Sequence, residues 1–450
     1  MALWQLAFKN LWRNPRRTFV TGLAIAAGFS GLCLFKGYIF RIERSLAISS
    51  IYTNHSGHFS IIKKGWLEKG FSKSKQFSIN ESEQYQIQEF LKSFNQDIIF
   101  QAPLFINIGL ISNGCRSVPF FFKGLNPNLR NWLFKNQEFL KWHTITNRKF
   151  EGKDFTLFSE QDFPLMITKN LALLMNKKTL YQNKLSLPAA KIIDCQSTLD
   201  KTSLSYDPSV QLLAKTFDGG VSAIDANIVG YFSYGFVFLE DMGLQGSLTL
   251  GQKLFDTHSI SRWLIYFENT EVTESWKTKV KPLFENKFPQ LEMLSYDDNR
   301  LNPFYVGTNN FLKSLSVFFI FITGTTITLA IINSLTISII ERSKEIGTLR
   351  ALGFTESQIS WIFSREMILL STISLFIGFI ITLIISYVIK ISNWTFEPPG
   401  AANPIKLEVA LVPEFMAILF LILTLLIGTI SFVLAKRRIK INIITLLIET

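Results

Sequence analysis

The hydrophobic pattern of the chain separates four long uncharged stretches from one long mixed region. The uncharged stretches are Thr18–Phe35, Ser314–Ile340, Met367–Ile389 and Phe415–Ala435. The first continues past Lys36 to about Phe40. A helix needs about 20 mostly apolar residues to cross the hydrocarbon core of a bilayer. The pattern therefore predicts four transmembrane helices, at 18–40, 308–340, 359–391 and 413–435.

The first span has a competing interpretation as a cleaved export signal, because Arg16 and Arg17 precede its apolar run. A lipoprotein signal fits poorly, since Leu32 stands before Cys33 where a small residue is expected. No small-x-small cleavage site follows, and three further spans already anchor the protein, so we expect an uncleaved helix. The segment 1–17 before it is either an interfacial helix on the inner leaflet or the start of a long, bent first helix.

The mixed region 41–305 has the composition of a folded domain, with aromatic and β-branched residues throughout. Glu81–Phe94 has helical character. The segments that read as strands between Gly, Asn and Pro turns are Asp97–Ile108, Val118–Lys123, Ile224–Leu239 and Arg262–Phe267. Lys63–Lys75 and Asn183–Tyr206 are expected to be loops. The predicted fold class is an α-helical membrane protein with a large α+β domain inserted between transmembrane helices 1 and 2.

Composition and charge favour a membrane protein over a nucleic-acid-binding protein. The 450 residues are 48% hydrophobic and only 18% charged, with a mean hydropathy of +0.24 and a net charge of +12. The net charge is +5 in residues 1–40, +4 in 41–305 and +3 in 306–450. Nucleic-acid binding would need a basic patch on the folded domain, but the long middle region is nearly balanced.

The positions of Lys and Arg predict the orientation, because basic residues near span ends stay on the cytoplasmic side. They gather before the first span, between the second and third, and after the fourth, whereas the short loop 392–412 has only Lys406. Both termini, including the tail 436–450, and the segment 341–358 are therefore expected in the cytoplasm of a bacterial cell. The domain 41–305 and the short loop are expected on the outer side of the inner membrane.

Few residues suggest catalysis or metal binding. The sequence has no Gly-x4-Gly-Lys-Ser/Thr phosphate-binding loop, so we do not expect it to hydrolyse nucleotides. His55 and His58 have the spacing of a metal pair, but no Cys or Asp cluster joins them, and a solvated loop is expected instead. Asp297 and Asp298 are expected to be part of a polar linker. We therefore predict no catalytic, cofactor-binding or metal-ligating residue.

The three cysteines lack metal-type spacing. Cys33 lies in an apolar run and is expected to be a buried thiol. Cys115 and Cys195 could pair in an oxidising compartment or remain two separate thiols.

The spans themselves argue against an ion-coupled carrier or channel, because the last three have no charged residue or histidine at their centre. Small residues in the first span (Gly22, Ala26 and Ala27) and Gly378 in the third would permit close helix packing.

The most specific segment, Glu341–Phe354, directly follows the second span. It is too charged to enter the bilayer and has helical periodicity with a narrow apolar stripe. It resembles the signature of the FtsX/MacB-type ABC transporter permeases, roughly Arg-x-x-Glu-Ile-Gly-x-Leu-Arg-Ala-x-Gly. The matching residues are Arg342, Glu345, Ile346, Gly347, Leu349, Arg350, Ala351 and Gly353. The resemblance extends to Phe122–Pro127 and Ile228–Phe232 and is weak across residues 130–220.

The resemblance implies a mechanism. Permeases of this family work as dimers, and each subunit binds a separate cytoplasmic ABC ATPase, which holds ATP and Mg²⁺. A coupling helix, here about 341–353 with the eight matching residues as its docking set, inserts into that ATPase. The chain would then be a non-catalytic membrane subunit that passes conformational work through the second span to the outer domain, a process called mechanotransmission.

The lipoprotein-releasing (LolC/LolE-like) branch is the most similar, because no ATPase domain is fused in this sequence. That similarity implies lipoprotein release from the inner membrane. One alternative is MacB-like export of peptides, lipids or drugs with a periplasmic adaptor. Another is an FtsX-like regulator of cell-wall hydrolases, although that branch usually has a smaller outer domain. The implied partners are the ATPase, a second permease subunit, lipoprotein cargo or an adaptor, and membrane lipid, but no nucleic acid.

Overall fold

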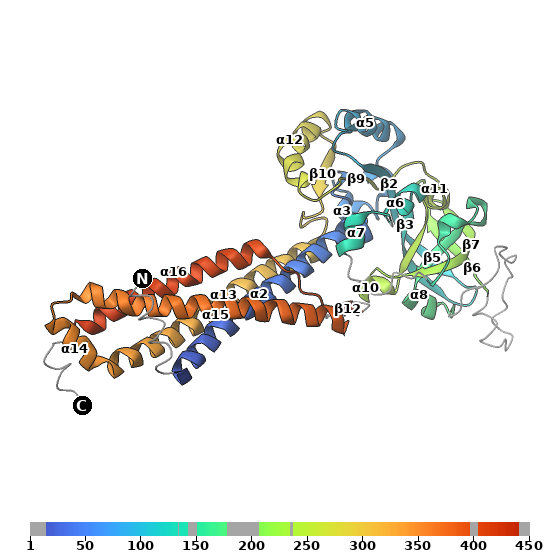
Figure 1. Cartoon of the computed structure of the whole chain (residues 1–450). Helices are drawn as coiled ribbons and strands as arrows, with labels where there is room; N and C mark the ends of the chain where they lie inside the picture. The colour runs from blue at the N-terminus through green and yellow to red at the C-terminus, as the bar shows by residue number, and fades with distance from the viewer. Residues whose placement is uncertain are drawn as a thin grey trace. The chain divides into compact units, whose positions relative to one another are not determined.

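The computed structural model describes residues 15–133, 135–142, 151–177, 207–234, 237–396 and 404–440. The chain divides into two compact units (Figure 1). The described part of unit 1 is residues 15–43, 309–394 and 407–440, and unit 2 takes its described residues from Arg44–Thr308 and Thr395–Lys406. Most of the segment 1–17, the tail beyond residue 440 and Cys195 lie outside the described residues.

The regular secondary structure in the described part of unit 1 is all helical. Its helices are α2 (Pro15–Ile48), α13 (Pro303–Glu341), α14 (Ser343–Ala351), α15 (Glu356–Ser392) and α16 (Pro413–Ile439), of which α2 and α13 extend into unit 2. All except α14 are long and apolar enough to cross a membrane. The four predicted spans are therefore confirmed as long apolar helices, and each helix extends beyond the apolar stretch that predicted it.

The core of unit 1 draws on all five helices. Figure 1 shows α2, α13, α15 and α16 side by side, with α14 at one end. Small residues set the distance between α2 and α15. A Cβ added to Gly378 would lie 2.7 Å from the carbonyl oxygen of Ala26, and one added to Gly22 would lie 2.9 Å from the Ser374 hydroxyl oxygen. The predicted close packing is confirmed at these residues, whereas Ala27 is exposed.

Two ion pairs tie α2 to its neighbours in unit 1. Near the start of α2, Arg17 contacts Glu341 at the end of α13 at 3.0 Å. Near its other end, Arg41 contacts Glu408 in the segment before α16 at 2.7 Å. The side chains of the first pair are partly exposed, so this pair contributes little to stability.

Unit 2 is built on a ten-stranded mixed sheet. Its strands are β1 (Phe59–Lys63), β2 (Phe100–Ser112), β3 (Ser117–Leu125), β4 (Glu151–Gly152), β5 (Pro164–Thr168), β6 (Ser209–Lys215), β7 (Val221–Phe232), β8 (Gly243–Ser247), β9 (Arg262–Tyr266) and β10 (Leu291–Ser295). A separate hairpin pairs β11 (Thr395–Phe396) with β12 (Ile405–Lys406). The expected short loop between the last two spans therefore contributes a small hairpin to unit 2.

The strand pairings close into a ring. From β2 the pairs run to β3, β8, β5, β7 and β6, and β6 pairs again with β2. The pairs β3–β8 and β5–β7 are parallel, and the other pairs in the ring are antiparallel. The strands β9, β1 and β10 extend the sheet from β2. This closure leaves few free strand edges.

Helices cover the sheet of unit 2. They are η1 (Ser49–Thr53, a π-helix), α3 (Trp66–Lys69), α4 (Ser74–Phe77), α5 (Glu81–Lys92), α6 (Pro127–Leu133), α7 (Gln137–Trp142), η2 (Phe155–Leu157), η3 (Glu160–Asp162), α8 (Lys169–Leu174), α10 (Val237–Glu240), α11 (Leu248–Phe255) and α12 (Val272–Lys287). Helices α5 and α12 share a core cluster with β1, β9 and β10, and α11 shares another with β3, β6 and β7. The mixed α+β architecture predicted for this region is confirmed.

The helix predicted at 81–94 is α5, whose first turn is closed by a capping box between Asn80 and Glu83. The four predicted strands correspond to β2, β3, β7 and β9. One boundary was wrong, because β7 ends at Phe232 and the chain forms α10. The Glu240 carboxylate accepts hydrogen bonds from the Tyr234 backbone N–H at 2.7 Å and the Ser233 hydroxyl at 2.6 Å, which stabilises this turn away from the sheet.

Two expected polar loops are more ordered than predicted. Residues 63–75 contain α3 and the start of α4, because Trp66 is buried and anchors the segment to a core. In the expected linker, Asp297 pairs with Lys277, and Asp298 pairs with Arg300. The two carboxylates therefore have separate partners and do not form an acid–base pair.

Candidate functional site

The signature segment forms α14, a short helix between two long ones. The helix α13 ends at Glu341, and the backbone changes direction at Arg342, which has φ −108° and ψ 18°. After α14 the chain reverses again and enters α15 at Glu356. The segment is therefore a separate helical element with two corners (Figure 1).

A buried ion pair joins the inner face of α14 to α15. The guanidinium of Arg342 contacts the Glu366 carboxylate through two nitrogens, at 2.9 and 3.4 Å. The Arg342 and Glu366 side chains are only 8% and 4% exposed. Ile346 and Gly347 are also buried, and Ile346 packs in the same core cluster as Ile359 and Ile439.

The end of α14 is a Schellman motif, which explains the glycine of the signature. Gly353 has φ +91°, in the left-handed region that glycine adopts without strain. Its N–H donates to the Arg350 carbonyl at 3.0 Å, and the N–H of Phe354 donates to the Leu349 carbonyl at 3.1 Å. A capping box between Thr355 and Gln358 then starts α15. This corner at Gly353 therefore sets the direction of α14 relative to α15.

Arg350 links the end of α14 to the end of α16. Its guanidinium donates to the Ile439 carbonyl at 3.2 Å and contacts Glu356 at 3.4 Å. Carbonyl groups in the last turn of a helix have no partner within that helix, so a basic side chain there is stabilising. Through Arg342 and Arg350, α14 is attached to both helices that follow it in sequence.

The outer face of α14 and the following corner are exposed. Leu352 and Phe354 are 71% and 43% exposed, and Glu345 and Thr348 on the preceding turns are also exposed. The structure therefore divides the eight signature residues. Arg342, Ile346 and Gly347 are buried, Leu349 and Arg350 are half-buried, and Glu345, Ala351 and Gly353 are exposed.

Sequence reasoning missed three residues of this site. Glu366 lies just before the uncharged stretch of the third span. A carboxylate next to such an apolar stretch was the only feature of the sequence that indicated a buried partner for Glu366. Leu352 was interpreted as part of the narrow apolar stripe, and no role was assigned to Phe354. Their exposure depends on the corner at Gly353, which the sequence pattern alone did not place.

Replacing Gly353 with valine is expected to destabilise the protein by about 1–2 kcal/mol, because a side chain is disfavoured in the left-handed region. No atom lies within 4 Å of a Cβ added at this residue, so backbone strain is the only cost. Gly353→Asn should lose clearly less, since asparagine tolerates this conformation. Thermal unfolding in detergent measures both variants, and equal losses would contradict the assignment.

Unit 2 contains buried histidines rather than the solvated pair that was expected. His55 is 4% exposed and His58 is fully buried. The expectation was wrong because His58 is enclosed by the rings of Tyr52, Tyr266 and Tyr296, and its Nδ1 accepts a hydrogen bond from the Phe267 N–H at 3.1 Å. Burial lowers the pKa of His58 to about 3 and also lowers that of His55. Both side chains are therefore neutral at pH 7.

Buried basic side chains lie beside His55. Burial, and then the nearby Arg262 guanidinium, lower the pKa of Lys123 to about 7. The Lys123 ammonium group donates to the Asn54 carbonyl at 3.0 Å and lies 4.5 Å from the centre of the Tyr234 ring. Arg130, in α6, is also near His55 and is paired with Asp154. Above pH 7, Lys123 loses its proton in the folded protein while it still holds the proton in the unfolded chain. The free energy of unfolding of unit 2 should therefore rise as the pH increases above 7.

Lowering the pH from 7 to 5 is expected to destabilise unit 2 by about 2 kcal/mol through His58 alone. The folded-state pKa of His58 is about 3, below its ordinary 6.5, so the unfolded chain binds more protons between these values. Stability is therefore lost as the pH falls below 6.5. Chemical unfolding of the whole protein at both pH values, followed by the fluorescence of its tryptophans, measures the loss.

His58→Asn is the matched variant for this measurement, because asparagine keeps a hydrogen-bond acceptor but does not titrate. Its stability should change less between pH 7 and 5 than that of the wild-type protein. An unchanged pH dependence in this variant would show that His58 is not the responsible group.

The described residues contain no group of three or more His, Cys, Asp or Glu side chains that could hold a metal ion. Cys33 is a buried free thiol, as expected. Cys115 is disulfide-bonded, which resolves the choice between a pair and two thiols for this residue. A disulfide is typical of a domain outside the reducing cytoplasm.

Comparison with known proteins shows that part of the helical unit is similar to a known family. No curated protein matches the chain. A solved structure, the extracellular domain of the noncanonic ABC-type transporter YknZ from Gram-positive bacteria, shares 10% identity with a TM-score of 0.27, over 48% of this chain and 90% of that one. Residues 317–443 match the family model described as FtsX-like permease C-terminal. This match includes α14 and lies across the last three candidate spans, so residues 317–443 of the chain are similar to the C-terminal part of FtsX-like permeases.

Proposed function

We propose that α14 is the coupling helix through which a separate cytoplasmic ATPase, carrying ATP and Mg²⁺, drives this permease. The observation that carries the proposal is the contrast between the two faces of α14. Its inner face is anchored by the buried Arg342–Glu366 pair. Its outer end presents Leu352 and Phe354 beside the charged Glu345, and an apolar centre with a polar rim is typical of protein interfaces.

The anchors support transmission of movement from α14 to the helices. The chain joins α14 directly to α13, Arg342 ties it to α15, and Arg350 ties it to α16. A displacement of α14 by the ATPase would therefore shift these helices together instead of bending a loop. This is the mechanotransmission that we propose, with unit 2 as the part that uses the movement.

In the proposed topology both termini and α14 are cytoplasmic, and unit 2 is an extracytoplasmic domain inserted between membrane helices 1 and 2. The distribution of Lys and Arg supports this orientation. The disulfide at Cys115 supports an oxidising compartment for unit 2. A bacterial inner membrane satisfies both conditions.

We also propose a dimer with a second permease subunit and lipoprotein release as the activity. The helix α13 has large exposed apolar side chains, including Val317, Phe318 and Phe321, which must face lipid or another subunit. Lipoprotein release rests on the similarity of the sequence arrangement to the lipoprotein-releasing branch, because the signature itself is common to the whole family. Export of peptides, lipids or drugs with an adaptor is the second candidate, and the large unit 2 disfavours a hydrolase regulator.

Co-purification with a candidate ATPase tests the docking proposal. Leu352→Asp and Phe354→Asp should each weaken binding at least tenfold and abolish stimulated ATP hydrolysis, because a carboxylate would be buried in the interface. Leu157→Asp is the matched control, since Leu157 is 65% exposed on unit 2 and lies far along the chain from α14. Unchanged binding and hydrolysis in both α14 variants would overturn the proposal.

Depletion of the protein from cells separates the proposed activities. Lipoproteins retained in the inner membrane would support lipoprotein release. Normal lipoprotein sorting together with altered sensitivity to drugs or peptides would overturn it in favour of export.

A further inference from the structure

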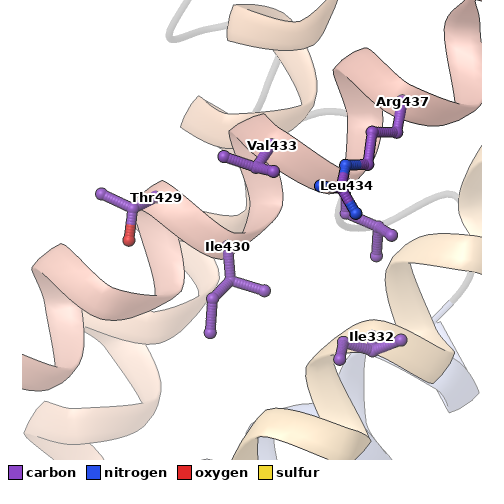
Figure 2. A pocket seen from close by; sticks show the side chains of 6 residues that line it. All are labelled: Ile332, Thr429, Ile430, Val433, Leu434 and Arg437. Carbon is purple, nitrogen blue, oxygen red and sulfur yellow. The ribbon is translucent and has the colours of Figure 1, made fainter.

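A groove of about 300 Å³ lies between α13 and α16 (Figure 2). Ile332 is its wall on α13. The wall on α16 follows one face of the helix and consists of Thr429, Ile430, Val433, Leu434 and Arg437. The groove thus follows about the last three turns of α16. It ends at a guanidinium group, which Figure 2 shows next to Leu434.

The lining of this groove suits a hydrocarbon chain better than water. Its volume would hold about ten water molecules at roughly 30 Å³ each. Water in a cavity needs two to four polar partners, but most of the lining is aliphatic. The Thr429 hydroxyl already donates to the Leu426 carbonyl at 3.0 Å. Val433 is 50% exposed, so the groove opens towards the surroundings of the helix bundle.

The basic end of the groove indicates the charge of its occupant. Lys436, Arg437 and Arg438 form the last turn of α16, and the only acidic residue in this helix is Glu414, in its first turn. None of the ion pairs among the described residues of unit 1 includes Arg437. An apolar channel that ends at a cationic side chain is complementary to an acyl chain joined to a phosphate.

We propose that this groove binds an anionic phospholipid from the leaflet at the basic end of α16, with an acyl chain along Val433 and Leu434 and the phosphate on Arg437. The arrangement uses the geometry expected for basic pockets between membrane helices, which bind anionic headgroups. The proposed lipid site lies on a face of unit 1 that the ATPase-docking proposal does not use. The success or failure of the lipid proposal is therefore independent of whether α14 binds an ATPase.

The position of the groove gives the lipid a structural effect. Ile332 lies nine residues before the end of α13, and the α16 wall ends two residues before Ile439, whose carbonyl receives the Arg350 hydrogen bond. A lipid in the groove would fix the spacing of the two helices beside α14. Bound lipid should therefore stabilise the folded helical unit.

The test compares the full-length protein in phosphatidylglycerol and in phosphatidylcholine bilayers. Phosphatidylglycerol should raise the melting temperature of the wild-type protein by several degrees relative to phosphatidylcholine. Arg437→Gln should lose more than half of this difference. Arg438→Gln is the matched control, since Arg438 is exposed in the same turn but does not line the groove, and it should behave like the wild-type protein.

A second variant tests the acyl-chain part of the site. Val433→Trp fills the groove and should reduce the phospholipid that native mass spectrometry detects on the purified protein. Equal losses of lipid preference in Arg437→Gln and Arg438→Gln would overturn the proposal in favour of general surface attraction. Retention of lipid by Val433→Trp with dissociation of an oligomer would overturn it in favour of a second copy as the occupant.

Discussion

Replacing Arg342 with alanine is expected to destabilise the helical unit by about 3–5 kcal/mol, the typical cost of breaking a buried ion pair. The substitution leaves the Glu366 carboxylate, 4% exposed, without the guanidinium that neutralises it. Glu366→Ala should be comparably costly, because it leaves the cation buried. Thermal unfolding of the detergent-solubilised protein measures the loss, and protease sensitivity near α14 reports whether the corner opens.

Two variants show whether this loss comes from an isolated charge. Arg17→Ala removes the other arginine paired near the end of α13, but the partners there are 18% and 45% exposed, so the cost should be below about 1 kcal/mol. The double variant Arg342→Met with Glu366→Leu should recover most of the stability, because it removes both charges and keeps apolar volume. A loss in Arg342→Ala no greater than that in Arg17→Ala would contradict the buried pair.

The spans and the position of α14 could be predicted because their signals are local. Twenty consecutive apolar residues identify a membrane helix, and the charged segment after Ile340 must leave the bilayer. The pairing of Arg342 with Glu366 could not be predicted in this way. Its partners are 24 residues apart on different helices, and periodicity along one helix carries no information on which side chain of another helix it meets.

Unit 2 shows the same limit in its strands. The long strands β2 and β7 have the β-branched and aromatic content that predicts a strand. Strand β8 has the sequence Gly-Leu-Gln-Gly-Ser, which resembles a turn. It is a strand because β3 and β5 pair with it on both sides. Gly243 is required there, since an added Cβ would lie 2.4 Å from a Thr168 methyl carbon.

The histidines illustrate how a chemical prediction depends on the fold. The spacing of His55 and His58 was compatible with a metal pair or a loop, and neither interpretation includes burial among aromatic rings. The sequence shows the tyrosines that enclose His58, but they lie in η1, β9 and the turn after β10. Only the pairing of β1 with β9 and β10 brings these segments together around His58.

Replacing Gly378 with leucine is expected to destabilise the protein. The loss should reach or exceed the upper end of the roughly 1–3 kcal/mol that is typical of overpacking. An added Cβ would lie 2.7 Å from the Ala26 carbonyl oxygen and 3.2 Å from its Cα, both backbone atoms that a rotamer change cannot move. The pairs Gly22–Ser374 and Ala26–Gly378 are four residues apart on both helices, so α2 and α15 cross in parallel through a small-xxx-small contact. Leucine would force this crossing apart along its length.

Gly324→Leu is the matched control. It distinguishes the loss of the close α2–α15 contact from the general effect of a larger side chain in a membrane helix. It makes the same substitution in α13, where no atom lies within 4 Å of an added Cβ. Its stability should match or slightly exceed that of the wild-type protein, because leucine favours a helix more than glycine does. Thermal unfolding of both variants in the same detergent measures the difference. Similar melting temperatures for Gly378→Leu and Gly324→Leu would show that α2 and α15 do not depend on this close approach, and that the bundle is held mainly by its larger apolar side chains.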